Sequence, residues 1–195
     1  MQVKRTTTTT MTTTTLLLTA AAYLITCLPA SASPVEVQVT FTGPSTTIND
    51  GHYYVGPYNL NIDETTTTGV CVTYDIEIYS GETWTATVNP ISASPLPQQV
   101  MYREEGWLAG QFFAADPGEW VGIAHAIWNL GGADYTDAGA GYWIGQAGAN
   151  YGTVDGSGWM VVTPVVDGAA QTMIVQVTPE PGTIGLMMIV LGVVG

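Results

Sequence analysis

The sequence predicts one α+β domain over residues 33–178, an antiparallel β-sheet with a helical insertion in the middle of the chain. Three observations support this fold class. Apolar and polar side chains alternate early in the domain and again near its end, and apolar residues between these regions recur at helical spacings. Strands, then helices, then strands is the order expected when helices pack against an antiparallel sheet.

The first two strands are predicted on either side of an Asn-Asp-Gly turn at residues 49–51. Residues 35–41 alternate as a half-buried strand does. Extended structure is expected again over residues 53–62, where Pro57 favours a strand at the edge of a sheet because proline has no N–H to donate.

Two more strands are predicted before the helices. The four threonines at residues 65–68 are expected to form a linker or the tip of a hairpin. Residues 70–79 show the clearest alternation in the chain, and residues 83–88 follow them past a Ser-Gly-Glu segment.

Three helices are predicted in the middle of the domain. The first covers residues 98–114 and ends before Asp-Pro-Gly, and the second covers residues 119–130 and ends at a Gly-Gly pair. The third covers residues 137–151, where many glycines permit close packing at a cost to helix stability. Strands then return at residues 159–163 and 172–177.

The N-terminal residues 1–32 read as a secretory signal peptide. Lys4 and Arg5 give a cationic start, residues 16–29 are largely apolar, and Ala30 and Ala32 are small residues at the cleavage positions. We expect cleavage after Ala32. Only Cys71 then remains, so the exported domain must fold without an internal disulfide.

Residues 179–195 form a separate C-terminal tail. Pro179, Glu180 and Pro181 are incompatible with a continuing strand or helix, and an apolar run follows them. This pattern resembles the PEP-CTERM sorting signal. The resemblance implies export by a bacterium with a Gram-negative envelope, processing by an exosortase-type enzyme, and a setting that is often rich in exopolysaccharide.

The tail departs from that family in two ways. No cationic residue follows Gly195, although the family has a short arginine-rich end. Residues 183–195 would rise only about 20 Å as a helix, against a hydrocarbon core of about 30 Å. We therefore expect weak or transient anchoring in the membrane, and a location in the cell envelope, at the cell surface or outside the cell.

The charge balance limits the partners. Without Lys4 and Arg5 the chain keeps one cation, Arg103, against sixteen acids, a formal charge of −15. A surface this acidic repels phosphate groups, so we expect no nucleic-acid partner. Neutral glycans such as extracellular polysaccharide, matrix proteins and cations such as Ca²⁺ remain as partners.

Signatures of enzymes and metal sites are weak. His52 and His125 lack metal-ligand spacing, and His125 is expected to be a packed or surface residue. Glu104 and Glu105 lie beside Arg103 on a helix predicted to be exposed, where a local ion pair explains them. We therefore expect no catalytic residues, no metal and no cofactor.

Much of the domain resembles one that recurs in PEP-CTERM proteins of environmental bacteria; the segments that carry this resemblance are residues 53–58, 69–71, 82–84, 107–109, 126–130 and 142–143. Cys71 together with residues 126–128 is also similar to the thioester domains of surface adhesins. That second resemblance implies a bond between the thiol and a glutamine side chain, but the glutamine position is Ala124. Gln111 or Gln146 would have to replace it; otherwise Cys71 is a small core residue.

The aromatic residues have two interpretations. Tyr53, Tyr54, Tyr58 and Tyr142 are candidate surface residues for stacking on sugars, whereas several tryptophans are expected in the core. The sequence thus predicts a non-enzymatic, structural or adhesive envelope or matrix protein. The alternatives are a covalent adhesin that uses Cys71 and a carbohydrate-binding or carbohydrate-active module.

Overall fold

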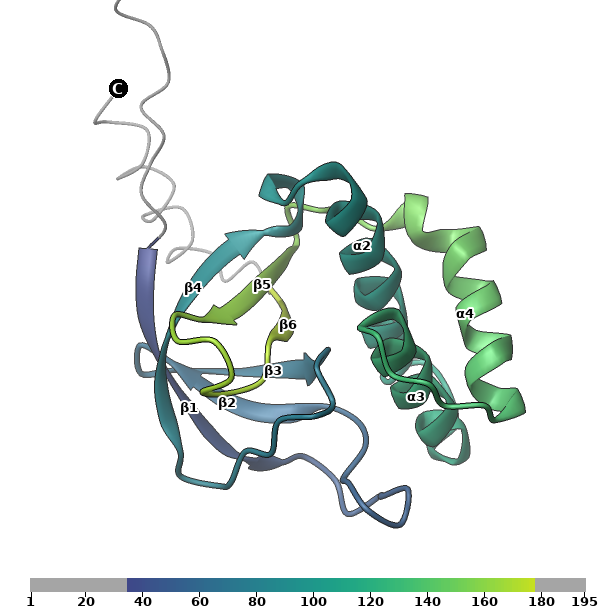
Figure 1. Cartoon of the computed structure of the whole chain (residues 1–195), viewed down its shortest axis with the longest axis horizontal. Coiled ribbons are helices and arrows are strands. Elements are labelled where there is room, and N and C mark those ends of the chain that lie inside the picture. The colour runs from purple at the N-terminus through teal and green to yellow at the C-terminus, as the bar shows by residue number, and fades with distance from the viewer. Residues whose placement is uncertain (1–34, 178–195) are drawn as a thin grey trace, which may run out of the picture. The chain divides into compact units, whose positions relative to one another are not determined.

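The computed structural model describes residues 35–177, which contain six strands and three α-helices (Figure 1). The strands are β1 (Val35–Pro44), β2 (Tyr58–Ile62), β3 (Thr65–Cys71), β4 (Thr83–Pro90), β5 (Trp159–Pro164) and β6 (Met173–Gln176). The helices are α2 (Leu96–Gln111), α3 (Trp120–Leu130) and α4 (Ala138–Asn150). Short 3-10 turns flank them: η1 (Ile91–Ala93), η2 (Pro117–Glu119) and η3 (Tyr151–Thr153).

The six strands close into a barrel in the order β1-β2-β3-β6-β5-β4, and every neighbouring pair is antiparallel. The α+β class and the antiparallel pairing are confirmed, and the predicted antiparallel sheet is closed into a barrel. Closure occurs because β1 pairs with both β2 and β4. A closed barrel leaves no unpaired edge strand.

The barrel interior is filled by side chains from alternating positions of the strands. On β1, Val37, Val39 and Phe41 point inward, while the residues between them face out. Leu60 from β2 and Met173 from β6 belong to the same interior cluster and are fully buried. This alternation is the pattern that predicted the first strand.

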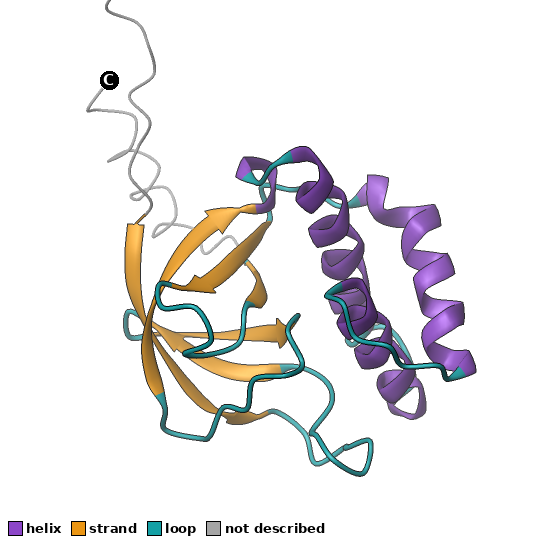
Figure 2. Cartoon of the chain, viewed as in Figure 1, coloured by secondary structure: helices purple, strands orange, loops and turns teal. Residues whose placement is uncertain are grey.

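A second apolar cluster joins the barrel to the helices. The outward-facing residues Val70, Val161 and Ile174 pack with Leu108 of α2 and Ile127 of α3. Figure 2 shows the purple helices gathered on one side of the orange strands. The inserted helices therefore cover one outer face of the barrel.

The hairpin between β2 and β3 differs from the prediction. Ile62 pairs with Thr65, so Asp63 and Glu64 form a two-residue turn, and both have positive φ angles of 43° and 68°. Such turns usually contain asparagine or glycine, so this sequence gave no signal for one. The threonines at residues 65–68 form the first half of β3 rather than a linker or hairpin tip, which suits their β-branched side chains.

The predicted strand over residues 70–79 is wrong beyond Cys71. Cys71 pairs with Met173, where β6 begins, so the strand ladder ends there. The following residues run through a loop to β4 despite their alternating pattern. The predicted extended segment over residues 53–62 is also shorter, because β2 begins at Tyr58.

The three predicted helices are confirmed with boundaries that shift by up to three residues. At the start of α4, the Asp137 side chain accepts a hydrogen bond from the Ala140 N–H, as an N-cap does. The close packing predicted for this helix is also present. A Cβ atom on Gly122 of α3 would lie 3.1 Å from Cα of Gly139, so the two helices touch through their backbones.

Candidate functional site

Three side chains from different elements meet beside the middle of α3, and we call them the histidine clamp: Asp50, His125 and Asp137. The Nδ1 atom of His125 lies 2.7 Å from Oδ2 of Asp137, and its Nε2 atom lies 3.1 Å from Oδ2 of Asp50. Asp50 belongs to the loop between β1 and β2, and Asp137 caps α4. The buried imidazole therefore ties a barrel loop to two helices.

Both carboxylates of the clamp are held in their charged form. Partial burial raises the pKa of Asp50, but the N–H groups of Tyr53 and His52 and the His125 ring outweigh it and lower the pKa below 3.8. Burial likewise raises the pKa of Asp137, and hydrogen bonds from His125 and Ala140 lower it below 3.8. Each ring nitrogen of His125 therefore faces a carboxylate oxygen, which is a hydrogen-bond acceptor.

Both ring nitrogens of His125 are engaged within the clamp. A general base needs a ring nitrogen that can take a proton from a substrate. Both nitrogens of His125 already contact a carboxylate, and its ring is buried. The structure therefore agrees with the prediction of a packed histidine.

Aromatic rings surround the clamp and extend to the surface. Tyr135 stacks on His125 with 3.8 Å between ring centroids and an angle of 16°. The ring centroid of Trp128 lies 5.7 Å from that of His125 and 5.6 Å from that of Tyr135. The Tyr53 ring meets Trp128 edge to face at 6.2 Å. Tyr74 meets Tyr135 edge to face at 6.1 Å.

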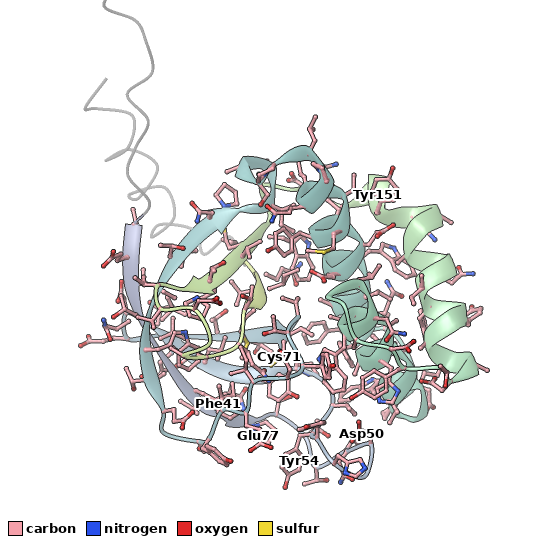
Figure 3. The ribbon with its side chains drawn as sticks, viewed as in Figure 1. Phe41, Asp50, Tyr54, Cys71, Glu77 and Tyr151 are labelled. Atoms are coloured by element: carbon pink, nitrogen blue, oxygen red, sulfur yellow. The ribbon has the colours of Figure 1, made fainter. Side chains whose placement is uncertain are left out.

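We call three of these residues, together with Tyr54, which follows Tyr53 in the chain, the tyrosine patch: Tyr53, Tyr54, Tyr74 and Tyr135. Tyr53, Tyr54 and Tyr74 are between 36% and 50% exposed, and Tyr135 is half-buried. In Figure 3, Asp50 and Tyr54 lie at the same end of the domain, away from Tyr151. The exposed rings thus lie beside the carboxylates of the clamp.

The backbone under the patch is fixed. The Asn129 side chain donates to the Tyr135 carbonyl at 2.7 Å and accepts from the Tyr135 N–H at 2.7 Å. On the other side, Asp50 accepts the N–H groups of His52 and Tyr53. Hydrogen bonds therefore hold the backbone in place at Tyr53 and at Tyr135.

The predicted surface tyrosines divide into three groups. Tyr53 and Tyr54 are exposed and belong to the patch, while Tyr142 is exposed on α4 and packs against Trp143 instead. Tyr58 was predicted wrongly, because it is only 8% exposed. Its ring points into the barrel against Phe41, its hydroxyl donates to the Tyr54 carbonyl, and burial raises its pKa.

Cys71 lies inside the barrel, and its Sγ atom is 3.8 Å from Sδ of Met173. Burial raises the pKa of this thiol, which makes the thiolate scarce. Ala126 and Ile127 belong to the other apolar cluster. Gln111 donates its amide to the Trp107 carbonyl at 3.3 Å, and Gln146 lies on α4, which packs against α2 and α3.

The burial of Glu105 shows that the prediction of an exposed helix is wrong for this face of α2. It is fully buried on α2, and within the described part of the chain neither carboxyl oxygen has a hydrogen-bond partner. Burial, and then the charge of Glu104, raise its pKa well above 4.5. No ion pair joins Arg103 to either glutamate in residues 35–177. Arg103 instead approaches the loop at Gly156, where a Cβ atom would lie 3.3 Å from its Nη2 atom.

Several predicted residues lie outside residues 35–177: Ala30, Ala32, Pro179, Glu180 and Pro181. Within the described residues, no helix is both long and apolar enough to span a bilayer. The same residues contain no group of three or more histidine, cysteine or acidic side chains that could hold a metal. Comparison with protein-family models, with curated proteins and with solved structures finds no match to this chain.

The histidine clamp was not predicted from the sequence. Asp50 and His125 are 75 residues apart, and only the folded chain brings them together. The sequence identified Asp50 as part of a turn and placed Asp137 at the start of a helix, which are their local roles. Neither role indicates that both aspartates contact one imidazole.

Proposed function

We propose that this chain is an exported, non-enzymatic protein of the cell envelope or extracellular matrix, and that its folded domain binds neutral glycan through the tyrosine patch. The exposed rings of Tyr53, Tyr54 and Tyr74 are the observation that carries the proposal; those of Tyr53 and Tyr74 are set edge to face against Trp128 and Tyr135. Tyrosine offers a flat apolar face and a polar tip, and loses little conformational entropy on binding. The apolar face of a sugar ring is a suitable partner for such a surface.

The acidity of the chain supports a neutral ligand. Arg103 is the single lysine or arginine between residues 35 and 177. Asp137 is 41% exposed beside the patch, and its lowered pKa keeps it charged at neutral pH. This carboxylate accepts hydrogen bonds from sugar hydroxyls but repels acidic polysaccharide.

Two reactive side chains are committed to the packing of the fold, which supports a non-enzymatic role. His125 uses both ring nitrogens to hold the clamp, and the Cys71 thiol is enclosed in the barrel. Both therefore stabilise the fold. A covalent adhesin would require a glutamine amide against Cys71, whose sulfur contacts Met173.

The proposed export and retention of the protein are based on the sequences of its N-terminal leader and C-terminal tail. The leader with Ala30 and Ala32, and the tail with Pro179, Glu180 and Pro181, support secretion and processing by an exosortase-type partner. The apolar tail supports a transient contact with the membrane. In this account the tail determines where the protein is retained, and the tyrosine patch determines what it binds.

The binding proposal is tested by affinity electrophoresis in gels that contain soluble neutral β-glucan, α-glucan or galactomannan. We expect retardation in at least one gel, and a Tyr54→Ala/Tyr74→Ala protein to bind at least about tenfold more weakly. Tyr142→Ala is the matched control, since Tyr142 is 58% exposed on α4 and lies outside the patch. Equal mobility of the wild-type and double-variant proteins in all three gels would contradict the proposal.

A further inference from the structure

A cleft of about 340 Å³ lies between the outer face of the barrel and α2, and it shares no residue with the tyrosine patch or the clamp. Its floor is apolar and is formed by Val70 of β3, Trp159 of β5, Ile174 of β6 and Ala109 of α2. Such a volume is at the small end of the range for ligand pockets in proteins.

Strand alternation explains why the cleft exists. Cys71 and Val175 face the barrel interior, so Val70 and Ile174 face α2. The same outward row continues to Thr68 on β3 and Gln176 on β6, which α2 does not cover. The helix ends nearby at Gln111, and the cleft opens beside it.

The rim of the cleft combines polar groups with one exposed aromatic ring. The Thr68 hydroxyl and the Gln176 amide can donate and accept hydrogen bonds. The Thr66 hydroxyl donates to Oδ1 of Asn61 at 2.9 Å and keeps its capacity to accept. Phe113, just beyond α2, is 65% exposed at the opposite side of the opening. No charged residue lines the cleft, in a chain with sixteen acids.

We propose that this cleft is a second binding site, and that it takes one or two rings of a neutral saccharide. An apolar floor fits the C–H face of a sugar ring, and the rim can bind its hydroxyl groups. The absence of charge from the lining favours a neutral ligand over an acidic sugar. The inference rests on the proposed function for its ligand class, and it adds a site that would let one domain hold two points of a glycan.

The test is a ¹⁵N–¹H NMR titration of the exported protein with three neutral disaccharides: cellobiose, maltose and diacetylchitobiose. We expect at least one of them to produce saturable shifts in the backbone amides of Thr68 and Gln176 and in the Trp159 indole N–H. Phe113→Ala should weaken this binding about fivefold through loss of ring stacking. Leu96→Ala is the matched control, because Leu96 is 77% exposed at the other end of α2.

The other outcomes overturn the cleft proposal. They are no shift at these groups with any disaccharide, shifts unchanged by Phe113→Ala, or saturation by hexanol alone, which would indicate an apolar ligand. The Tyr54→Ala/Tyr74→Ala protein separates this test from that of the patch. If the double variant keeps the cleft shifts, failure of the patch proposal leaves the cleft site intact.

Discussion

Replacing Glu105 with methionine should stabilise the protein, although the residue is fully buried on α2. Within residues 35–177 its carboxyl oxygens have no hydrogen-bond partner, so folding removes this group from water without replacing its hydrogen bonds. Such a loss costs about 1–3 kcal/mol for one buried polar group. Methionine has a similar size and helix propensity, so Glu105→Met should raise the free energy of unfolding by about 1–3 kcal/mol at pH 5.

The difference in free energy of unfolding between the Glu105→Met and wild-type proteins should grow as the pH rises. The pKa of Glu105 in the folded protein is raised above 4.5, so above pH 4.5 the folded state binds more protons than the unfolded state. The contribution of Glu105 to the free energy of unfolding is therefore largest below the pKa that this group has in the unfolded state. It falls as the pH rises towards the raised pKa of the folded state, by at most about 1.4 kcal/mol per pH unit. The Glu105→Met protein has no carboxyl group at this position, so its free energy of unfolding should not show this fall with pH.

The assay is urea unfolding followed by tryptophan fluorescence at pH 5, 6, 7 and 8 for the wild-type and Glu105→Met proteins. Glu104→Met is the control, because the neighbouring Glu104 is half-buried and should change stability far less. A less stable Glu105→Met protein, or the same pH dependence in both proteins, would refute the reasoning by showing that the carboxyl group has a partner.

Two further predictions concern the clamp and the helix contact. His125→Ala should lower the free energy of unfolding by about 2 kcal/mol in urea at pH 6, since it leaves two carboxylates without their shared donor. In the wild-type protein the clamp should weaken as the pH falls below 3.8, because Asp50 and Asp137 take up protons only there. Acid unfolding at the same pH in the wild-type and His125→Ala proteins would contradict this. Gly122→Leu should destabilise the protein by about 1–3 kcal/mol, because its Cβ would meet Gly139 at 3.1 Å, whereas Gly141→Ala on α4, with open space around it, should be neutral or slightly stabilising in thermal unfolding.

The helices and most strands could be predicted from local patterns. Residues 35–41 alternate because one side of β1 faces the barrel interior, and the end of α3 at residue 130 coincides with a Gly-Gly pair. Closure into a barrel is different, because it depends on β1 pairing with β4 across more than 40 residues. An alternating strand has the same pattern in an open sheet and in a barrel.

The errors arise where tertiary structure overrides a local signal. The alternating residues 73–79 lie in a loop, because the pairing of β3 ends with the hydrogen bond from the Val72 N–H to the Thr172 carbonyl. Tyr58 reads as a surface residue in the sequence, but its place in β2 turns its ring inward. Glu105 has the composition of an exposed helical position, yet the face it occupies packs into the core.

The candidate site was predicted in part. Tyr53 and Tyr54 were identified as surface aromatics, but Tyr74 and Tyr135 were not, because one lies in the loop mistaken for a strand and the other in a connection between helices. The histidine clamp and the cleft join residues from three or more elements. Contacts between residues of separate elements cannot be predicted from a local sequence pattern.

Intact mass spectrometry of the protein from its native host tests the central claim most directly, with membrane, surface and medium fractions compared. The account predicts a chain that begins at Ser33 and ends between Pro179 and Pro181, with or without attached glycan, outside the cytoplasm. The mass should show no further deficit of one ammonia, since the Cys71 thiol is enclosed beside Met173. A chain that retains Met1 and the complete tail in the cytoplasm would contradict export and sorting.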